Sequence, residues 1–447
     1  MLGVFARNLL AIPGSRKDAK NREASSTSNR FFDGRLLLSI VKMRRINPHK
    51  FQVATRGTSR EINRQIALNL IHTHQPISRA DLARLMGLRR GAVSLLINEL
   101  LSDGAIFEGM TGEVRRGRKP TFLYIDSRGR SIVGVDIRVT RTYIMVTDRL
   151  CRPLVGPINF PTDHDPQKLV TELSKRIKQI LADHSEVGDC DGVGVVVPGM
   201  VDQRTRRILN APTLGWRDID IAELLGAATS LPIEIENSGK ACALSQLWSG
   251  RGDTSVTDLA FVTVSDGVGV GIITGGEVLR GRHNIAGEFG HVPLNIDGPR
   301  CSCGATGCWE AYISNLATLS RYFGRNLQEA KPIPAEIAAF TIEDLIARAR
   351  AGDAKAATAI QSTARYLGLG LASIINAIDP SRIYVGGEIT TAWDLIERTV
   401  RDGLAERALT VAASNPDIRV VSAVDYPRLR GAAALVAAPA FAAPAVA

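Results

Sequence analysis

The sequence predicts an α/β protein in which a small, basic, helical module precedes a larger α/β body. Three observations predict it: apolar residues at helical spacing in the first third, alternating strand-like and helix-like runs after residue 130, and positive charge confined to the first third. A chain of 447 residues, of which 45% are hydrophobic, can bury enough apolar surface for two or three domains. A single small module is therefore excluded.

The distribution of charge separates the two ends of the chain. Residues 1–58 carry 12 Lys+Arg and 3 Asp+Glu, residues 59–130 carry 12 and 7, and the remainder carries 31 and 35. The whole basic excess thus lies in the first third, which indicates that this end meets a polyanion such as nucleic acid. We expect residues 1–58 to be a disordered extension, for which a solubilising tail and a DNA-binding arm fit equally well. Met43 is an alternative start of the chain.

The sequence gives no sign of a membrane or secreted protein. No apolar run approaches the roughly 18 residues that cross a bilayer, and the leading stretch is interrupted by Arg7 and Asn8. That stretch also lacks the small-residue cleavage site of a secretory signal. Six cysteines in so long a chain cannot form a disulfide framework. We therefore expect a cytoplasmic protein without a membrane partner.

Two helices are predicted at the start of the basic module. Over residues 59–73 apolar residues recur at helical spacing with polar residues between them. The second helix begins after Ser78, an N-cap residue followed three positions later by Asp81, and includes the apolar residues Leu82, Leu85 and Met86. It ends at Gly87, as expected of a helix stop.

A third helix is predicted over residues 89–101. It places Arg90, Ser94 and Asn98, four residues apart, on the side opposite its apolar face. The apolar face is formed by Val93, Leu96, Ile97 and Leu100. Two short helices joined by a tight glycine turn form a helix-turn-helix, although an ordinary helical hairpin would show the same spacing.

The segment after these helices predicts a β-hairpin with a basic tip. Residues 105–108 and 121–125 are strand-like, with a turn near 111–112 and the run Arg-Arg-Gly-Arg-Lys-Pro at 115–120. Such a wing completes a winged helix-turn-helix over residues 59–126, in which the third helix reads base edges and the wing meets phosphates. The predicted DNA-contacting residues are Arg79, Arg89, Arg90, Ser94 and Asn98 in the helices, and Arg116, Arg118 and Lys119 in the wing.

Beyond residue 130 strands alternate with helices, which predicts a mainly parallel sheet covered by helices. The expected strands are 132–135, 143–146, 192–197 and 259–264, and the expected helix is 167–183. Gly267, Gly269 and Gly271 follow the last strand, but a glycine-rich turn alone is weak evidence for phosphate binding.

One imidazole and three thiols within eighteen residues predict a zinc site. His291, Cys301, Cys303 and Cys308 supply the four donors of a closed tetrahedral site, and glycines let the loop fold around an ion. With no open position, the zinc is expected to be structural and to hold the loop that carries Glu288 and Glu310. The other cysteines, Cys151, Cys190 and Cys242, are expected to be buried and free.

The motif GEFGH at 287–291, followed by CSCGATGCWE at 301–310, resembles the ROK family of repressors, open reading frames and sugar kinases. The resemblance runs from about Gly134 to about Ala438, and the module in front makes the chain similar to the repressor branch, such as the xylose and N-acetylglucosamine repressors. It implies an actin-like, hexokinase-like body of two α/β lobes over residues 131–438, with a sugar in the cleft between them. Residues 439–447 would form an Ala/Pro-rich tail.

The resemblance also implies which residues contact the sugar. The family uses an Asn-Asp pair, the Glu and His of its GExGH motif, and the Glu that ends the cysteine motif. Asn237, Glu288, His291 and Glu310 match these positions, whereas Ser238 replaces the Asp of the pair. Amides and carboxylates suit vicinal hydroxyls because these are paired donors and acceptors.

Departures from the family pattern predict that the chain is not an enzyme. Ser238 cannot act as the general base that a ROK kinase needs. Arg138 and Asp266 stand in the two phosphate loops, where the family has small residues, and Glu388 follows the adenosine-side glycines. A long cation would fill the first loop, and a carboxylate would repel phosphate at the second.

We therefore predict a sugar-responsive DNA-binding regulator, a repressor of sugar transport or catabolism genes without kinase activity. Its expected partners are operator DNA, a small sugar or sugar phosphate, and further copies of itself in a homodimer or homotetramer. One alternative is an active ATP-dependent sugar kinase fused to a DNA-binding module. Another is a regulator controlled by a protein partner.

Overall fold

A computed structural model describes residues 56–111, 120–249, 256–327, 337 and 339–441 of the chain. Most of the predicted N-terminal extension lies outside these residues. So does the tip of the predicted wing, which includes Arg116, Arg118 and Lys119.

The N-terminal module consists of three helices and a small antiparallel sheet of order β1-β3-β2. Its helices are α1 (Arg56–His74), α2 (Arg79–Met86) and α3 (Arg90–Ser102), and its strands are β1 (Ile77–Ser78), β2 (Ile106–Thr111) and β3 (Thr121–Ile125). The Ser78 hydroxyl accepts a hydrogen bond from the Asp81 amide, and Gly87 ends α2 with φ of 63°, so both predicted ends of this helix are confirmed.

The predicted apolar face of α3 is buried in the core of this module, together with Leu82 of α2. Leu85 differs from the expectation, because 53% of its surface is exposed. An eight-residue helix has too few turns to bury both sides, and the side that carries Leu85 faces outward.

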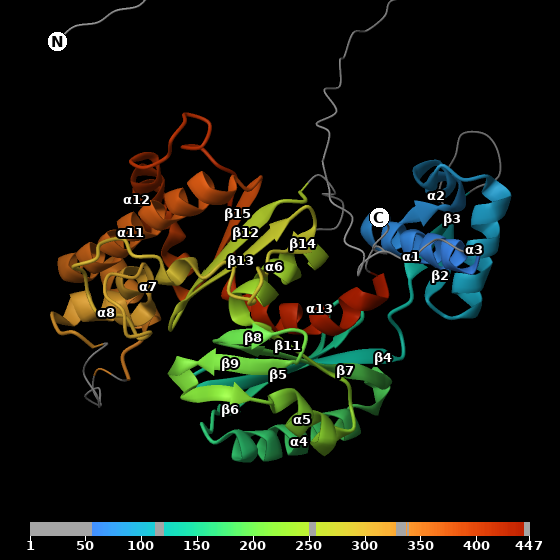
Figure 1. The fold of residues 1–447 in the computed structure, drawn as a ribbon, viewed down its shortest axis with the longest axis horizontal. Helices are drawn as coiled ribbons and strands as arrows, with labels where there is room; N and C mark the ends of the chain where they lie inside the picture. Colours follow the sequence, from blue (N-terminus) through green and yellow to red (C-terminus); the bar gives the residue numbers. More distant parts are fainter. Residues whose placement is uncertain (1–55, 112–119, 250–255, 328–336, 338, 442–447) are drawn as a thin grey trace, which may run out of the picture. The chain divides into compact units, whose positions relative to one another are not determined.

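The first lobe is built on a five-stranded sheet of order β11-β7-β4-β5-β6. Its strands are β4 (Arg130–Ile137), β5 (Arg141–Asp148), β6 (Pro153–Pro161), β7 (Asp189–Val197) and β11 (Ile233–Asn237). Helices α4 (Pro166–Asp183) and α5 (Ile221–Thr229) cover its outer face in Figure 1, and their apolar residues share one core with the sheet. A small sheet is formed by β8 (Met200–Asp202), β9 (Arg207–Ala211) and β10 (Trp216–Ile219).

The second lobe is built on a sheet of order β14-β13-β12-β15-β16. Its strands are β12 (Leu259–Val264), β13 (Val268–Thr274), β14 (Glu277–Val278), β15 (Arg382–Gly387) and β16 (Ile418–Val421). The helices on its outer side are α7 (Glu310–Ile313), α8 (Asn315–Phe323), α10 (Ile342–Arg350), α11 (Ala354–Ile378) and α12 (Trp393–Ala405). These helices and the sheet form the largest apolar core of the described chain.

The prediction of a mainly parallel sheet is wrong. In each five-stranded sheet two neighbouring strand pairs are parallel and two are antiparallel. The short connections from β4 to β5 and from β12 to β13 form hairpins, which only antiparallel strands allow. Both faces of β4 and β12 are buried, so their sequences lack the alternation that marks an antiparallel strand.

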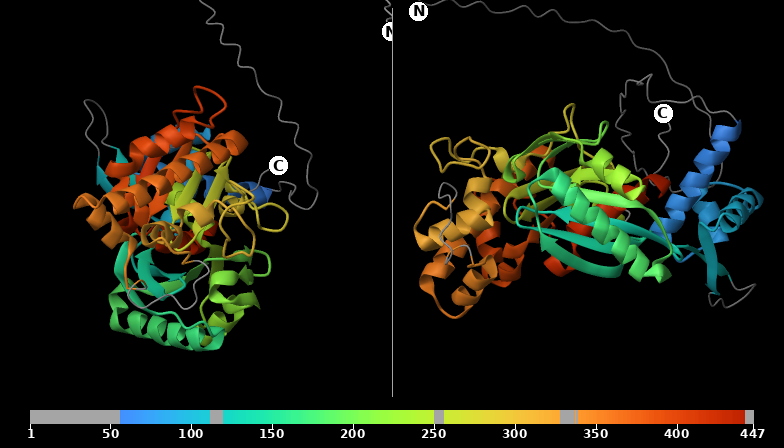
Figure 2. Two further views of the ribbon diagram at one scale, coloured as in Figure 1. Left: turned by 90° about the vertical axis from the view of Figure 1, so that its left-hand side faces the viewer. Right: turned by 90° about the horizontal axis from the view of Figure 1, so that it is seen from below.

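Two central helices, α6 (Ser238–Ser249) and α13 (Pro427–Phe441), lie between the two sheets in both figures (Figures 1 and 2). They touch so closely that a Cβ added at Gly431 of α13 would lie 2.0 Å from the Ala241 carbonyl oxygen of α6. A Cβ at Gly194 of β7 would lie 1.8 Å from the Ala432 carbonyl oxygen. Only glycine permits this stack of sheet and helices. Helix α13 runs on through Phe441, into the predicted tail.

No helix among the described residues is both long and apolar enough to cross a bilayer.

Candidate functional site

A cavity of about 410 Å³ lies between the two lobes. It brings together the four residues predicted to bind sugar, Asn237, Glu288, His291 and Glu310, from widely separated parts of the chain. Other polar residues in its lining are Arg138, Asn210, Thr213, Ser238, Asp266, Ser302, Cys303 and Arg428. We call the part around Glu288, His291 and Glu310 the acceptor end, and the part around Arg138, Asp266 and Arg428 the charged end.

Asn237 ends strand β11 at the wall of this cavity. Its amide nitrogen donates to the Gly199 carbonyl over 2.9 Å, and its amide oxygen accepts from the backbone nitrogen of Gly239 over 2.8 Å. The side chain therefore caps the start of α6 and joins it to the loop after β7. Its polar atoms already have partners within the protein, which the sequence could not indicate.

Glu288 lies half-buried at the acceptor end, and burial raises the pKa of its carboxyl above the ordinary value. Lys240 and His291 act in the opposite direction. Lys240 itself is only 2% exposed, and its ammonium group donates to the Asn284 carbonyl over 2.5 Å. This buried lysine was not predicted from the sequence, although a single cation near the start of α6, next to the apolar residues that follow it, indicated a buried polar group.

Glu310, at the start of α7, connects two loops of the cavity. One carboxylate oxygen accepts from the Val268 amide, and the other accepts from the Ser302 hydroxyl, both over 2.9 Å. A Cβ at Gly267 would lie 2.7 Å from the first of these oxygens, so a side chain there would push into the carboxylate. Glu310 thus joins the glycine-rich turn before β13 to the cysteine loop.

The four predicted metal ligands converge beside the acceptor end. The donor atoms of His291, Cys301, Cys303 and Cys308 all lie within 4.8 Å of one another. The Cys303 and Cys308 sulfurs are 3.7 Å apart, as are the Cys301 sulfur and the His291 Nδ1. Tetrahedral bonds of about 2.3 Å to a central ion place ligand atoms about 3.8 Å apart. These residues could therefore hold a metal ion.

The other three cysteines lie away from this cluster. Cys151 and Cys242 are buried, Cys190 is half-buried, and all six cysteines of the chain are free of disulfides.

The charged end of the cavity contains a network of ion pairs. The Arg138 Nε donates to Asp136 over 2.7 Å, and an Arg138 Nη lies 3.6 Å from Glu388, which belongs to the other lobe. Arg428 approaches the second Asp136 oxygen at 3.8 Å. Burial alone would lower the pKa of Arg138, but Asp136 and Glu388 raise it. Enclosure in the cleft raises the pKa of the Asp266 carboxyl.

The N-terminal module exposes most of the helical residues predicted to contact DNA. Arg89, Arg90 and Asn98 are exposed and Ser94 is half-buried. Arg79 donates to the Asn98 side-chain oxygen over 3.0 Å and pairs with Glu108 at 2.9 Å. Arg79 and Asn98 thus form one unit that links α2, α3 and β2.

The two sheets, the central helices and the cavity between the lobes define a class, proteins with an actin-like or hexokinase-like ligand-binding body. Over residues 132–438 the sequence matches the ROK family, and the chain belongs to this family.

Relatives of two kinds resemble the chain. The xylose repressor of Bacillus spizizenii is 28% identical over 362 residues, which cover 79% of this chain and 89% of the repressor. A solved ROK family transcriptional regulator, a homologue of the E. coli MLC protein, has a TM-score of 0.70 at 25% identity and covers 86% of this chain and 97% of its own. A ROK family glucokinase from Streptomyces griseus, in complex with glucose and AMPPNP, has a TM-score of 0.58 at 29% identity and covers 68% of this chain and 98% of its own.

Proposed function

We propose that this ROK protein is a sugar-responsive transcriptional regulator, a repressor of sugar transport or catabolism genes that binds a sugar without phosphorylating it. The observation that carries the proposal is that one chain joins two features. An N-terminal helical module presents a polar face outward, and a sugar-kinase-like cleft is filled at one end by the protein's own charges. The repressor and regulator relatives support it because their matches extend beyond the ROK segment.

In this proposal the N-terminal module is a winged helix-turn-helix. Helix α3 would enter the major groove with Arg90, Ser94 and Asn98 toward base edges, and Arg79 would fix Asn98. Arg89 precedes α3 and would assist it. The wing residues Arg116, Arg118 and Lys119, outside the described part of the chain, would meet phosphates. The proposed domains remain 59–126 for DNA and 131–438 for sugar.

The proposed absence of kinase activity follows from the charged end of the cavity. Arg138 is paired with both Asp136 and Glu388 where a kinase would hold phosphates. Ser238 offers no carboxylate to accept the proton of a sugar hydroxyl. Glu288 and Glu310 remain as acceptors for sugar hydroxyls, and the ring nitrogen of His291 that does not hold the metal would be a donor. Binding can persist where phosphoryl transfer is lost.

We infer that His291, Cys301, Cys303 and Cys308 hold one zinc ion. Three thiolates and one imidazole suit zinc and fill a tetrahedral shell, so the ion has no open position for a water or substrate. Its role would be structural, since the cysteine loop hydrogen-bonds Glu310 through Ser302.

Operator binding by a homodimer or homotetramer completes the proposal, because two copies read half-sites about one helical turn apart. The experiment enriches binding sites from a random-sequence DNA pool and then measures affinity for the enriched duplex with and without aldoses. Light scattering with the enriched duplex gives the number of chains bound. A protein that bound no duplex selectively, or whose affinity no sugar changed, would contradict the proposal.

Variants then separate the roles of helix and wing. Asn98→Ala or Arg90→Ala should reduce discrimination between the enriched duplex and random DNA, whereas Arg118→Ala with Lys119→Ala should weaken binding to both and flatten the salt dependence. Arg398→Ala, an exposed arginine of α12, is the matched control and should change neither. Identical effects of the helix and wing variants would show that the assignment of roles is wrong.

A further inference from the structure

The charged end of the cavity contains more negative than positive groups. Among the residues that the structure describes, Asp136, Asp266 and Glu388 face only two arginines, Arg138 and Arg428. Asp136 is fully buried, and its nearest cations are these two arginines, at 2.7 and 3.8 Å. The Arg138 guanidinium also lies over the Tyr143 ring, 4.6 Å from its centroid, which fixes its position.

A phosphate group entering this end would meet, in the described part of the chain, two arginines that are each already paired with a carboxylate. A phosphate monoester adds nearly two negative charges at neutral pH. If Arg138 left Asp136 to bind it, Asp136 would stay buried with only the more distant Arg428. If Arg138 instead left Glu388, the ion pair between the two lobes would be lost. An uncharged hydroxyl requires no such exchange of partners.

We propose that the effector is an uncharged sugar and that the five residues of this charged end exclude phosphorylated sugars. The proposal rests on the proposed function, because it concerns the ligand of the same cavity. Arg138 and Glu388 are its specificity-determining residues, since their ion pair joins the two lobes at the place where a phosphate would have to sit.

The test is titration calorimetry with matched pairs, glucose with glucose 6-phosphate and N-acetylglucosamine with its 6-phosphate. In any pair that binds, the uncharged member should bind at least tenfold more tightly. Equal or tighter binding of a phosphorylated member would overturn the proposal. Failure of every uncharged aldose and every phosphate to bind would instead overturn the proposed function.

A charge variant gives a second readout. Glu388→Gln keeps a side chain that can accept from Asn315, whose amide donates to Glu388 over 3.1 Å, but removes one negative charge. It should reduce the preference for the uncharged member at least threefold. Glu406→Gln, in an exposed ion pair with Arg365, is the control and should leave the preference unchanged. An unchanged preference in Glu388→Gln would contradict the role of this residue.

A second inference concerns how the cavity is connected to the N-terminal module. Both central helices begin at the cavity, α6 with Ser238 and α13 near Arg428. Their other ends reach helix α1, because Trp248 of α6 and Phe441 of α13 line a second cavity of about 600 Å³ together with α1 residues. At 1.5 Å per residue the two helices span about 18 and 22 Å.

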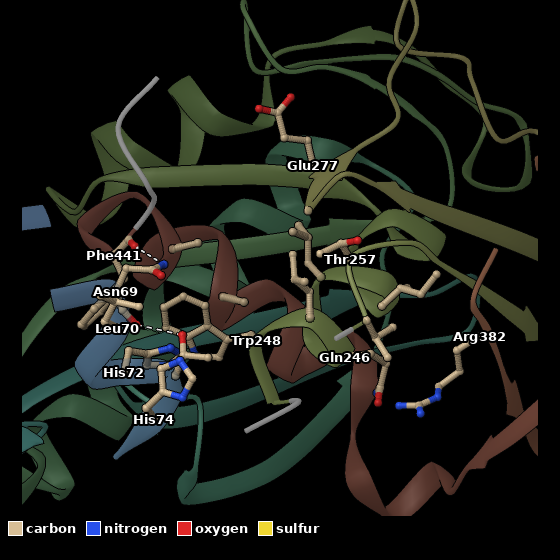
Figure 3. Close-up of a pocket in the computed structure, with 18 of the residues that line it drawn as sticks. Asn69, Leu70, His72, His74, Gln246, Trp248, Thr257, Glu277, Arg382 and Phe441 are labelled. Carbon is tan, nitrogen blue, oxygen red and sulfur yellow. Dashed lines mark hydrogen bonds between the residues drawn. The ribbon is translucent and has the colours of Figure 1, made fainter. Parts of the chain in front are cut away.

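Figure 3 shows how α1 is held at this junction. The Asn69 amide donates to the Phe441 carbonyl over 2.9 Å. The His72 ring lies 4.2 Å from the Trp248 ring and 5.3 Å from the Phe441 ring, measured between centroids. The Trp248 and Phe441 rings also pack edge to face, with their centroids 5.3 Å apart. One helix of the N-terminal module therefore contacts the far ends of both central helices.

We infer that α6 and α13 transmit the state of the cleft to the N-terminal module through this aromatic junction. The helices are packed backbone to backbone at Gly431, so a shift of one lobe on sugar binding displaces the junction instead of being absorbed by side chains. This inference also rests on the proposed function, since it concerns how sugar binding changes DNA affinity.

The test measures three quantities for Trp248→Ala, Phe441→Ala and Asn69→Ala: sugar affinity, affinity for the enriched duplex, and the change in DNA affinity on adding sugar. Sugar affinity should stay within twofold of the wild type, while the sugar-induced change in DNA affinity falls at least fivefold. Trp393→Ala on α12 is the matched control and should keep the full change. Asn69→Ala removes one hydrogen bond only, so it remains informative where a ring deletion unfolds the protein.

Full retention of the sugar-induced change in Asn69→Ala and in every folded ring variant would overturn the inference. Loss of sugar binding by these variants would also overturn it, because the junction would then shape the cleft instead of reporting on it. A wild-type protein without any sugar response would contradict the proposed function, which is a distinct result.

Discussion

The two ends of the cleft cavity are built from similar residue types but are in opposite states. At the acceptor end, Glu288 lies half-buried beside His291 and has no ion pair shorter than 4 Å within the described residues. At the charged end, Arg138 is bound to Asp136 and Glu388. The difference teaches that residue type alone does not define a binding group: a charge can recognise a ligand only where the protein has not already supplied its partner.

The largest effect is expected from removing the metal that would stabilise the acceptor end. Cys303→Ser should reduce zinc from about one ion per chain to near zero and lower the thermal midpoint, because a closed metal site contributes directly to folding. Metal analysis of purified protein and a melting curve measure both. Cys190 is half-buried and lies outside the cluster, so the control variant Cys190→Ser should retain the metal. Wild-type protein purified without zinc would contradict the assignment.

Substitution at the charged end should lower the stability of the folded protein. Arg138→Ala should lower the free energy of unfolding by about 2–3 kcal/mol, because it leaves the buried Asp136 carboxylate with Arg428 alone. Urea denaturation measures the change, and a second substitution, Asp136→Asn, should recover part of it. The control Arg365→Ala breaks an exposed pair with Glu406 and should cost under about 1 kcal/mol. Equal losses of unfolding free energy in Arg138→Ala and Arg365→Ala would contradict the expected difference between a buried and an exposed ion pair.

Substitutions at the acceptor end should lower the affinity for sugar. Glu310→Ala removes the acceptor that joins Val268 and Ser302, and Glu288→Ala removes a carboxylate of the cavity wall. Each should weaken sugar binding by about 1–3 kcal/mol while binding to DNA without sugar remains. Calorimetry with the sugar that binds the wild type measures the loss. Glu310→Gln should lose less, and wild-type affinity in Glu310→Ala would show that the sugar binds elsewhere.

No gain of kinase activity is expected from restoring the carboxylate that Ser238 replaces. Ser238→Asp should not phosphorylate a sugar in the presence of ATP, because Arg138 and Asp266 still occupy the charged end. A coupled assay for ADP with a panel of aldoses measures turnover. Phosphorylation by this variant, or by the wild type, would show that the two ends of the cavity cooperate in catalysis.

Features set by neighbouring residues were predictable from the sequence. The ends of α2 follow from Ser78 and Gly87, and the buried face of α3 follows from its apolar spacing. The metal-binding potential of the cysteine cluster was predictable because three of its four ligands lie on one short loop. Such local patterns depend on backbone geometry, which is the same in every fold.

Features that join distant segments were decided only by the tertiary structure. The sequence did not indicate that Glu388 would pair with Arg138, that the Asn237 amide would cap α6, or that Lys240 would be buried. It also did not distinguish mixed from parallel sheets, because strands buried on both faces look alike in either. Nor did it place Phe441 against α1, since the composition of the last residues favoured a tail. The sequence by itself determined the family, the helix faces and the cluster that could bind a metal, because most residues of each lie close together in the chain. The state of each charge in the cleft depends on which segments the chain topology brings within a few ångströms, and the tertiary structure decided that.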